Sequence, residues 1–329
     1  MSTKVAFISI LTNVKQYCDL AITTITSYIY TNTTKIDWII LYEDCLDEIK
    51  QKLDHLQGDL VNFKFIPLYD IENQNYKDIN YIKIARDYCC KNFISRIFNI
   101  NNLKDKYDVL CPCDFDILFV KDLKDKLDNI DFNYQMIGCE ENNEYVEWVL
   151  SFKAHHQVSP YLNKKFYINF GFAILICKNI NFDLTSAFQK ISEENKLKYL
   201  ATQEQSFFAQ VLDKIFVDNS LQLFMWNRYD FPISIPTYYT VHFSVQQYLL
   251  EKIKTSDRSI FSHKYAITIC YMELYKDIIS KCKRLSSEFI DRINYNYNVL
   301  CKLKEKYPLL AEYIKQYYKL PEIKWNWNI

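Results

Sequence analysis

The stretch from Tyr107 to Leu123 constrains the fold of this chain more than any other segment. An apolar run, Val109 to Cys113, leads into two carboxylates one residue apart, Asp114 and Asp116, and a second apolar run, Ile117 to Val120, follows at once. Two acids at the end of a buried strand are costly unless something positive lies against them, so a divalent cation is their natural partner. The pattern predicts a cation site at a strand end; the alternative is a solvated turn between strands.

Composition sets the class of protein. The chain has 329 residues, 49% of them hydrophobic and 24% charged, which indicates a globular protein with a large core. Its formal net charge of zero gives no overall attraction to nucleic acid, so we expect none as a partner. The eleven scattered cysteines, without a Cys-x-x-Cys pair, indicate free thiols in a reducing compartment. No apolar run reaches 18 residues and the start runs directly into a strand pattern, so we expect a cytoplasmic protein without a membrane span or signal peptide.

Glycine is scarce, with only three in the chain, Gly58, Gly138 and Gly171. The chain therefore contains neither a P-loop nor a G-x-G-x-x-G fingerprint. A bound nucleotide would have to be held through a metal ion and cationic side chains instead.

Short apolar strands alternate with helical periodicity along most of the chain. The first strands are expected at 4–11, 38–42 and 61–67, with helices at 17–30, 45–56 and 78–98 between and after them. This alternation predicts an α/β fold with a parallel sheet wound by helices on both faces. Later strands are expected at 135–139, 166–177, 215–226 and 238–244, and later helices at 184–192 and 202–212. We expect one domain over residues 1–246 and a helical C-terminal extension over 247–329.

Further short motifs surround the two acids in a definite order. They are Leu11-Thr12-Asn13 with Tyr17, Arg96 located 18 residues before Asp114, Ile168-Asn169-Phe170-Gly171, Glu204-Gln205 and Val241-His242-Phe243. Their order, over about residues 4 to 244, resembles that of the retaining GT-A glycosyltransferases of family 8, which include glycogenin and bacterial galactosyl- and glucosyltransferases.

The resemblance implies a GT-A (Rossmann-like) domain that moves a hexose from a UDP-sugar, such as UDP-glucose, UDP-galactose or UDP-GlcNAc. Asp114, Asp116 and His242 are the implied ligands of Mn²⁺ or Mg²⁺. The residues implied to hold the nucleotide sugar are Thr12, Asn13, Tyr17, Arg96, Asp114, Phe115, Asp116 and Gly171. Those implied beside the reacting carbon are Asn169, Glu204 and Gln205.

The chain also departs from the family pattern. The Gly-x-x-Lys-Pro-Trp element that follows the histidine in the family is replaced here by Ser244-Val-Gln-Gln-Tyr. Candidate substitutes for its lysine are Lys252, Lys254, Arg258 and Lys264, and His263 is a rival to His242. Glu204 stands where the family has Asp, which adds a methylene. Pro112 lies inside the expected central strand, where it removes a ladder donor.

Several alternatives remain open from the sequence. The absence of the Gly-x-x-Lys-Pro-Trp element favours a non-catalytic nucleotide-sugar or glycan-binding protein. A third hypothesis is an inverting transferase in which Glu204 or another acid is the general base. The structural alternatives are that His242 is a core histidine and that Arg96 is a salt-bridge partner on a solvated helix. The sequence leaves a glycan, lipid-linked or protein acceptor open. The basic C-terminal residues fit peripheral membrane contact, a homo-oligomer contact or a solvated face: Lys281, Lys283, Arg284, Lys302, Lys304 and Lys306.

Overall fold

The structure is a computed structural model that describes residues 3–12, 14–68, 88–140, 168–193, 203–224, 239–242, 275–306 and 308. Its elements, in chain order, are β1 (Val5–Leu11), α1 (Val14–Thr31), β2 (Ile36–Tyr42), α2 (Leu46–Leu53), η1 (Asp54–Leu56), β3 (Val61–Pro67), α3 (Tyr88–Leu103), β4 (Val109–Pro112), β5 (Ile117–Phe119), α4 (Lys124–Asp128), β6 (Met136–Glu140), β7 (Ile168–Ile176), η4 (Cys177–Asn179), α6 (Leu184–Glu193), α7 (Gln203–Val211), β8 (Ile215–Val217), β9 (Gln222–Phe224), β10 (Thr240–His242) and α10 (Ser287–Lys306).

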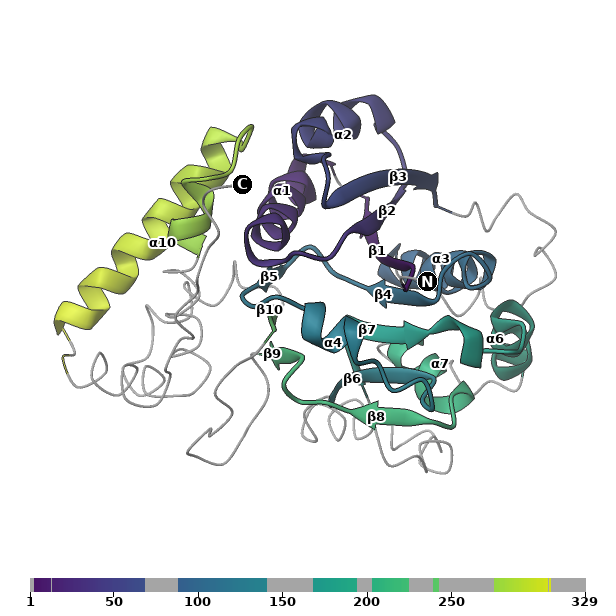
Figure 1. The fold of residues 1–329 in the computed structure, drawn as a ribbon. Helices are drawn as coiled ribbons and strands as arrows, with labels where there is room; N and C mark the ends of the chain where they lie inside the picture. Colours follow the sequence, from purple (N-terminus) through teal and green to yellow (C-terminus); the bar gives the residue numbers. More distant parts are fainter. Residues whose placement is uncertain are drawn as a thin grey trace, which may run out of the picture.

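A seven-stranded sheet forms the centre of the molecule (Figure 1), with the strand order β3-β2-β1-β4-β7-β6-β8. Strands β3, β2, β1 and β4 run parallel to one another. Strand β7 is antiparallel to both β4 and β6, and β8 is parallel to β6. The predicted α/β class with a mostly parallel sheet is therefore confirmed. The carboxyl ends of β1 and β4 lie side by side at one edge of this sheet.

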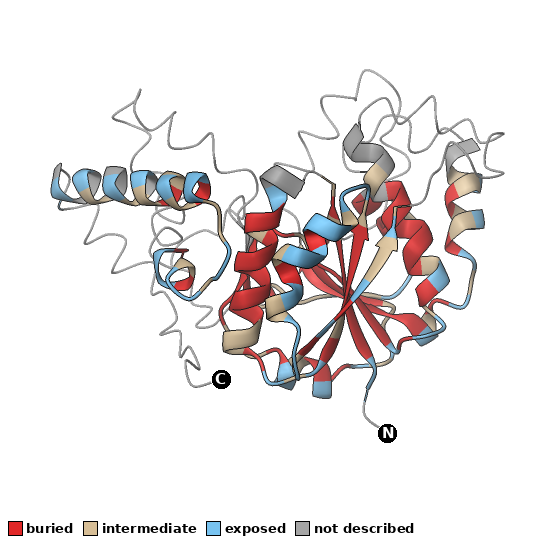
Figure 2. Ribbon diagram, turned by 90° about the horizontal axis from the view of Figure 1, so that it is seen from above, coloured by how far each residue is buried: buried red, intermediate tan, exposed pale blue. Residues whose placement is uncertain are grey.

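Helices bury both faces of the sheet, as the near-continuous apolar strands require. Alternate residues of β1 enter different cores: Val5 and Phe7 belong to the cluster under α1 and α2, while Ala6 and Ile8 belong to the cluster under α3, α6 and α7. Figure 2 shows the resulting pattern, with buried residues on the strands and on the inner sides of the helices. Helix α1 buries residues spaced three or four apart, namely Cys18, Ala21, Ile22, Ile25 and Tyr28.

The segment predicted as one strand over 215–226 is divided between two sheets. Residues 215–217 form β8 in the large sheet, whereas β9 joins a three-stranded sheet of order β5-β10-β9. The chain turns between them at Asp218, whose Oδ1 accepts hydrogen bonds from the amide and the hydroxyl of Ser220. Periodicity alone reports that both pieces are strand-like and not which sheet each one joins.

Proline at position 112 is accommodated because β4 ends there. It is paired with Ile8 of β1 as the last residue of the strand, and the next amide, that of Cys113, donates to the Ile8 carbonyl at 3.0 Å. The helix expected over 78–98 is α3, and its expected residues 78–87 lie outside the described part of the chain.

The described C-terminal segment contacts the outer side of α1 and α2. The Ser286 amide donates to Oδ1 of Asp19 on α1 at 3.0 Å, and the Ser286 hydroxyl donates to Oδ2 of the same carboxylate. Arg284 donates to the carbonyl of Gln51 and to Asp54. From this contact α10 extends away from the body (Figures 1 and 2). Within the described residues, no helix combines the length and apolarity that crossing a membrane requires.

Candidate functional site

The predicted acidic motif lies at the carboxyl end of β4, in the middle of the sheet. An isolated bridge pairs Cys113 with Phe172 of β7, and the Asp114 amide donates to the Gly171 carbonyl at 2.8 Å. Thr12, which directly follows β1, belongs to the same edge. In open α/β sheets, ligands bind at the carboxyl ends of the strands, where neighbouring loops diverge.

The turn that carries the two acids is held by hydroxyl groups of β1 and α1. The Ser9 hydroxyl donates to the Cys113 carbonyl at 2.6 Å and accepts from the Trp38 indole at 2.9 Å. The Thr24 hydroxyl lies 2.8 Å from both the Phe115 and the Ile117 carbonyls. The backbone on both sides of Asp116 is therefore anchored to α1.

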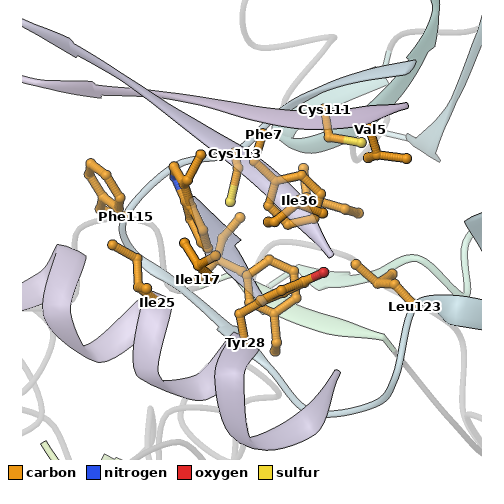
Figure 3. Close-up of a cluster of buried hydrophobic side chains, with 14 of the residues drawn as sticks. Val5, Phe7, Ile25, Tyr28, Ile36, Cys111, Cys113, Phe115, Ile117 and Leu123 are labelled. Atoms are coloured by element: carbon orange, nitrogen blue, oxygen red, sulfur yellow. The ribbon is translucent and has the colours of Figure 1, made fainter. Parts of the chain in front are cut away.

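The aromatic ring between the acids faces inward. Phe115 is 5% exposed, lies in the hydrophobic cluster shown in Figure 3, and stacks on Trp38 with ring centroids 6.3 Å apart. Phe115 was predicted among the nucleotide-binding residues. Because the ring is buried, a contact of this residue with a nucleotide would have to come from its backbone.

Arg96 joins three distant segments of the chain. Its Nε and Nη2 donate to the two carboxylate oxygens of Glu204 on α7 at 2.8 and 2.5 Å, and its Nη1 donates to Asp114 Oδ1 at 2.8 Å. Arg96 and Glu204 are almost completely buried, whereas the Asp114 side chain is 34% exposed. Burial lowers the pKa of Arg96, but the charges of Glu204 and Asp114 outweigh it and raise that pKa above its usual value. The guanidinium is therefore a permanent cation inside the domain.

The charge balance of this cluster is negative. Three carboxylates, those of Asp114, Asp116 and Glu204, are set against one guanidinium. Burial raises the pKa of Glu204 while Arg96 opposes that effect. With Glu204 engaged by Arg96 through both oxygens, the remaining negative charge is concentrated on the partly exposed pair Asp114 and Asp116. A bound cation would offset that charge.

The Asn169–Gly171 motif lies at the start of β7 beside Asp114. The Asn169 Oδ1 accepts hydrogen bonds from the Gly171 amide at 2.9 Å and from Nε2 of Gln222 at 2.8 Å. Gln205 donates to the Ile168 carbonyl at 3.0 Å. Gln222, which is fully buried on β9, was missed by sequence reasoning because a lone glutamine in an apolar run carries no motif. These amides fix the strand backbone next to the acids.

The register of β10 bears on the predicted third metal ligand. Strand β10 is antiparallel to β5, and its His242 is paired with Ile117, the residue after Asp116. The backbone of His242 therefore lies next to the acidic turn, and its side chain lies outside the described part of the structure. Among the side chains that the structure describes, no group of three or more His, Cys, Asp or Glu could hold a metal ion. Two carboxylate oxygens and a nearby histidine are nonetheless a donor set that Mn²⁺ accepts.

The other predicted residues divide between the described and undescribed parts of the chain. Tyr17 is 37% exposed on the first turns of α1. Several residues named in the sequence analysis lie outside the described positions: Asn13, Ser244, Lys252, Lys254, Arg258, His263 and Lys264. The structure thus brings together Arg96, Asp114, Glu204, Asn169 and Gly171, from four segments.

No protein-family model and no curated protein matches the sequence. Solved structures of sugar transferases do match the fold. A galactosyltransferase, LgtC, in complex with donor and acceptor sugar analogues is 12% identical with a TM-score of 0.54, covering 87% of this chain and 99% of that one. Mouse xyloside xylosyltransferase 1 is 12% identical with a TM-score of 0.55, covering 74% and 98%. The bifunctional glycosyltransferase WbbM is 15% identical with a TM-score of 0.53; 80% of this chain matches about half of that chain, 52%.

These likenesses establish the fold. The chain has the GT-A glycosyltransferase fold, a mostly parallel sheet with helices on both faces, as the sequence resemblance implied.

Proposed function

We propose that this chain is a metal-dependent, retaining glycosyltransferase of the family 8 type that moves a hexose from a UDP-sugar to a glycan, lipid-linked or protein acceptor. The observation that carries the proposal is the junction of Arg96, Asp114 and Glu204 at the carboxyl end of β4. These residues are widely separated in sequence and are joined directly in the fold. A fold shared with galactosyl- and xylosyltransferases adds support.

Asp114 and Asp116, with His242 beside them in the strand register, would hold Mn²⁺ or Mg²⁺. Such an ion, when bound, supplies Lewis-acid stabilisation of the diphosphate leaving group. Oxygen and imidazole donors suit Mn²⁺ better than Ca²⁺. The hydrogen bond from Arg96 to Oδ1 of Asp114 fixes the orientation of that carboxylate. Its other oxygen, Oδ2, would then be held ready to bind the metal ion.

The remaining residues orient the donor. Thr12 follows β1 at the same sheet edge, and it would contact the nucleotide together with Asn13 and Tyr17, which come next in the sequence. Gly171 lets the strand backbone approach the sugar closely, and Asn169 and Gln205 stabilise that backbone. Glu204, fixed by Arg96, would orient its negative charge toward the carbon at which oxocarbenium character develops.

The inverting alternative requires Glu204 or another acid as a general base. Both Glu204 oxygens accept hydrogen bonds from a buried arginine, and its side chain is only 3% exposed. A carboxylate engaged in this way is a poor proton acceptor for an incoming hydroxyl. The arrangement therefore argues against Glu204 as that base, and the anomeric configuration of the product separates the two mechanisms.

A UDP-release assay over a panel of UDP-sugars, with Mn²⁺ and with chelator, tests the proposal. We expect release from one donor that depends on Mn²⁺ and is lost in Asp114→Ala and Asp116→Ala, both still folded by circular dichroism. Exposed Asp125→Ala on α4 is the matched control and should keep full turnover. UDP binding without turnover in the presence of acceptors would instead support the sugar-nucleotide-binding alternative. Turnover in both site variants would contradict the metal role.

For the domains, we propose a GT-A domain over 1–246 and a helical extension over 247–329. Peripheral attachment to an anionic membrane through the extension belongs to this proposal, with a cytoplasmic location. Lys281, Lys283 and Lys302 are exposed, whereas Arg284 is engaged with α2 and η1. Co-sedimentation with anionic vesicles that weakens with salt would support attachment.

A further inference from the structure

A small pocket opens on the large sheet between helix α4 and strand β8, bounded by Lys126 and Phe216. Its volume is about 170 Å³, and its lining comes from α4, the turn after α4, and strands β6, β7 and β8. Figure 1 shows α4 beside these strands, with β8 at the end of the sheet order. The lining includes none of the residues assigned above to the donor site, so this α4–β8 pocket is a separate feature of the molecule.

A row of three apolar side chains crosses the sheet at this pocket. Ile174 of β7 is paired with Ile137 of β6, which is paired in turn with Phe216 of β8. Because paired residues of neighbouring strands project to the same face of a sheet, the three side chains lie side by side. Ile174 and Ile137 are buried, whereas Phe216 is 43% exposed. The two isoleucines therefore form the floor of the pocket, and the phenylalanine ring reaches the surface.

A second aromatic ring lies against Phe216. The ring centroids of Tyr134 and Phe216 are 5.1 Å apart, with the planes tilted by 41°. The turn that carries Tyr134 is held by Asn179, whose Nδ2 donates to the carbonyls of Phe132 and Tyr134 at 2.6 and 2.5 Å. The aromatic wall of the pocket is therefore fixed before any ligand binds, as is usual for binding sites.

Polar groups supply the rest of the lining. The Lys126 ammonium is paired with Asp218 at 2.5 Å, and Asn129 and Asp131 follow on the exposed turn after α4. The Asp131 carboxylate is oriented because its Oδ1 accepts from the Asn133 amide at 2.9 Å. Ammonium and amide donors thus stand beside amide and carboxylate acceptors around one pair of aromatic rings.

Charge and size limit what this pocket can hold. Its lining carries two carboxylates and one ammonium, and the ammonium of Lys126 is already paired with Asp218. A phosphate or a nucleoside diphosphate would therefore meet net negative charge. The volume of about 170 Å³ lies below the roughly 300–1,000 Å³ of sites for drug-sized ligands. A compact, neutral ligand fits both limits.

A pyranose ring has the chemistry that this lining matches. The C–H groups on one face of the ring pack against an exposed aromatic side chain such as Phe216. The hydroxyl groups around its edge both donate and accept hydrogen bonds, as the mixed polar lining requires. A purely apolar ligand would leave the polar groups of Asn129 and Asp131 without hydrogen bonds.

We propose that the α4–β8 pocket binds one neutral pyranose unit of the acceptor glycan, with Phe216 as the surface on which it stacks. This inference rests on the proposed function, and it selects the glycan among the acceptor classes named there. A sugar unit bound here would keep the rest of the same glycan near the reaction site and so raise its effective concentration.

The test is a methyl nuclear magnetic resonance titration of isoleucine-labelled protein, which needs no turnover. The probes are the methyl α- and β-glycosides of glucose, galactose, mannose and N-acetylglucosamine, added in the presence of UDP and Mn²⁺ so that the donor site is occupied. We expect the methyl signals of Ile137 and Ile174 to shift with at least one glycoside. The signal of Ile97, in the core on the other face of the sheet, should stay unchanged.

Substitutions at Phe216 separate stacking from simple apolar packing. Phe216→Leu keeps an apolar side chain without a flat ring, and it should bind the glycoside at least about tenfold more weakly, as the loss of an aromatic anchor does. Phe216→Tyr keeps the ring and should bind as the wild type does. Tyr295→Leu on α10, 53% exposed, is the matched control and should also bind as the wild type does. If Phe216→Leu does not fold, Asn129→Ala on the exposed turn replaces it, with weaker binding expected.

The outcomes separate the inference from the function on which it rests. The inference is wrong if no glycoside shifts Ile137 or Ile174, or if folded Phe216→Leu binds as tightly as the wild type. Shifts of these two signals by UDP or phosphate alone would assign the pocket to an anion and overturn it as well. If no donor gives UDP release but the glycoside shifts persist and depend on Phe216, the proposed function falls and the pocket remains a sugar-binding site.

Discussion

At the scale of single residues, the central feature is a buried charge cluster. The side chains of Arg96 and Glu204 are 1% and 3% exposed, whereas that of Asp114, which Arg96 also binds, is 34% exposed. Removing both charges from water is expensive, so such pairs are stable only with close geometry and several hydrogen bonds. Three short bonds from one guanidinium meet that requirement. The cluster thus holds the site in shape before any ligand arrives.

Substituting Arg96→Met should destabilise the protein strongly, because two carboxylates would lose their shared cation. We expect a loss of about 3–5 kcal/mol in the free energy of unfolding, the usual result of breaking a buried pair. Lys124→Met is the control: its pair with Asp128 is exposed on both sides, and about 0.5 kcal/mol or less should be lost. Urea denaturation compares the two. Similar losses in both variants would mean that Arg96 is not buried as described.

A second residue-scale prediction concerns the contribution of Asp218 to the stability of the folded protein and its loss at acid pH. Burial raises the pKa of this carboxyl, but the bonds from Lys126 and Ser220 outweigh burial and the pKa is lowered. A lowered pKa in the folded state means that the interaction stabilises the folded protein at pH values above about 3.9, the ordinary pKa of an aspartate. That stability is lost as the pH falls through the lowered pKa.

Asp218→Asn should therefore be less stable than the wild type at pH 7, and the difference should shrink as the pH drops below about 4. Denaturation at a series of pH values measures it. Exposed Asp125→Asn on the neighbouring helix serves as the control and should show a smaller difference at pH 7. A gap between Asp218→Asn and wild type that stays constant with pH would show that the effect is not electrostatic.

At the scale of elements, the pairing of β6 with β7 determines the position of β7, the strand that carries Asn169 and Gly171. The register shifts between Gly138 and Glu140, and Ile168, the first residue of β7, is paired with Glu140. A Cβ added at Gly138 would lie 2.2 Å from Cγ2 of Ile168, a branched and fully packed side chain. Glycine is therefore needed at position 138, because a residue with a Cβ could not approach β7 this closely. The pairing matters for the site because β7 carries Asn169 and Gly171, which lie beside the acids.

Gly138→Ala should cost about 1–3 kcal/mol of stability, because the added methyl group forces β7 or Ile168 to move. Gly58→Ala provides the matched control, since nothing lies within 4 Å of the Cβ it would add, and we expect it to be neutral or slightly stabilising. Thermal unfolding of the two variants is the measurement. Equal melting temperatures would contradict the close contact between β6 and β7.

At the scale of the whole molecule, the C-terminal segment and the sheet domain share a buried interface. Asp19, 3% exposed, receives two hydrogen bonds from Ser286, and Leu285 and Cys282 pack against the core under α1. Buried interfaces of this kind couple the unfolding of the parts they join. We therefore expect one cooperative transition for the domain and its described extension.

Ser286→Ala should lower the free energy of unfolding by about 1–3 kcal/mol, because a buried carboxylate loses a donor. Far-ultraviolet circular dichroism and intrinsic fluorescence should still give coincident transitions. Ser287→Ala, at the exposed neighbouring position, should change stability far less. Two separate transitions in the wild type would show that the segment folds independently of the sheet.

Much of this molecule was determined by the sequence alone. Strand and helix periodicity predicted the α/β class, and the positions of β1, β2, β3 and β7 agree with it, because apolar patterning must match the period of each element. The acids 114 and 116 were recognised as a strand-end site because buried charge demands a partner. The order of motifs predicted the GT-A fold.

Only the tertiary structure decided which groups meet. No local pattern reports that Arg96 binds Glu204 across more than a hundred residues, that Gln222 holds Asn169, or that residues 215–226 divide between two sheets. Periodicity follows from the backbone geometry of one segment, whereas ion pairs and sheet order depend on packing between segments, which is settled only when the whole core closes.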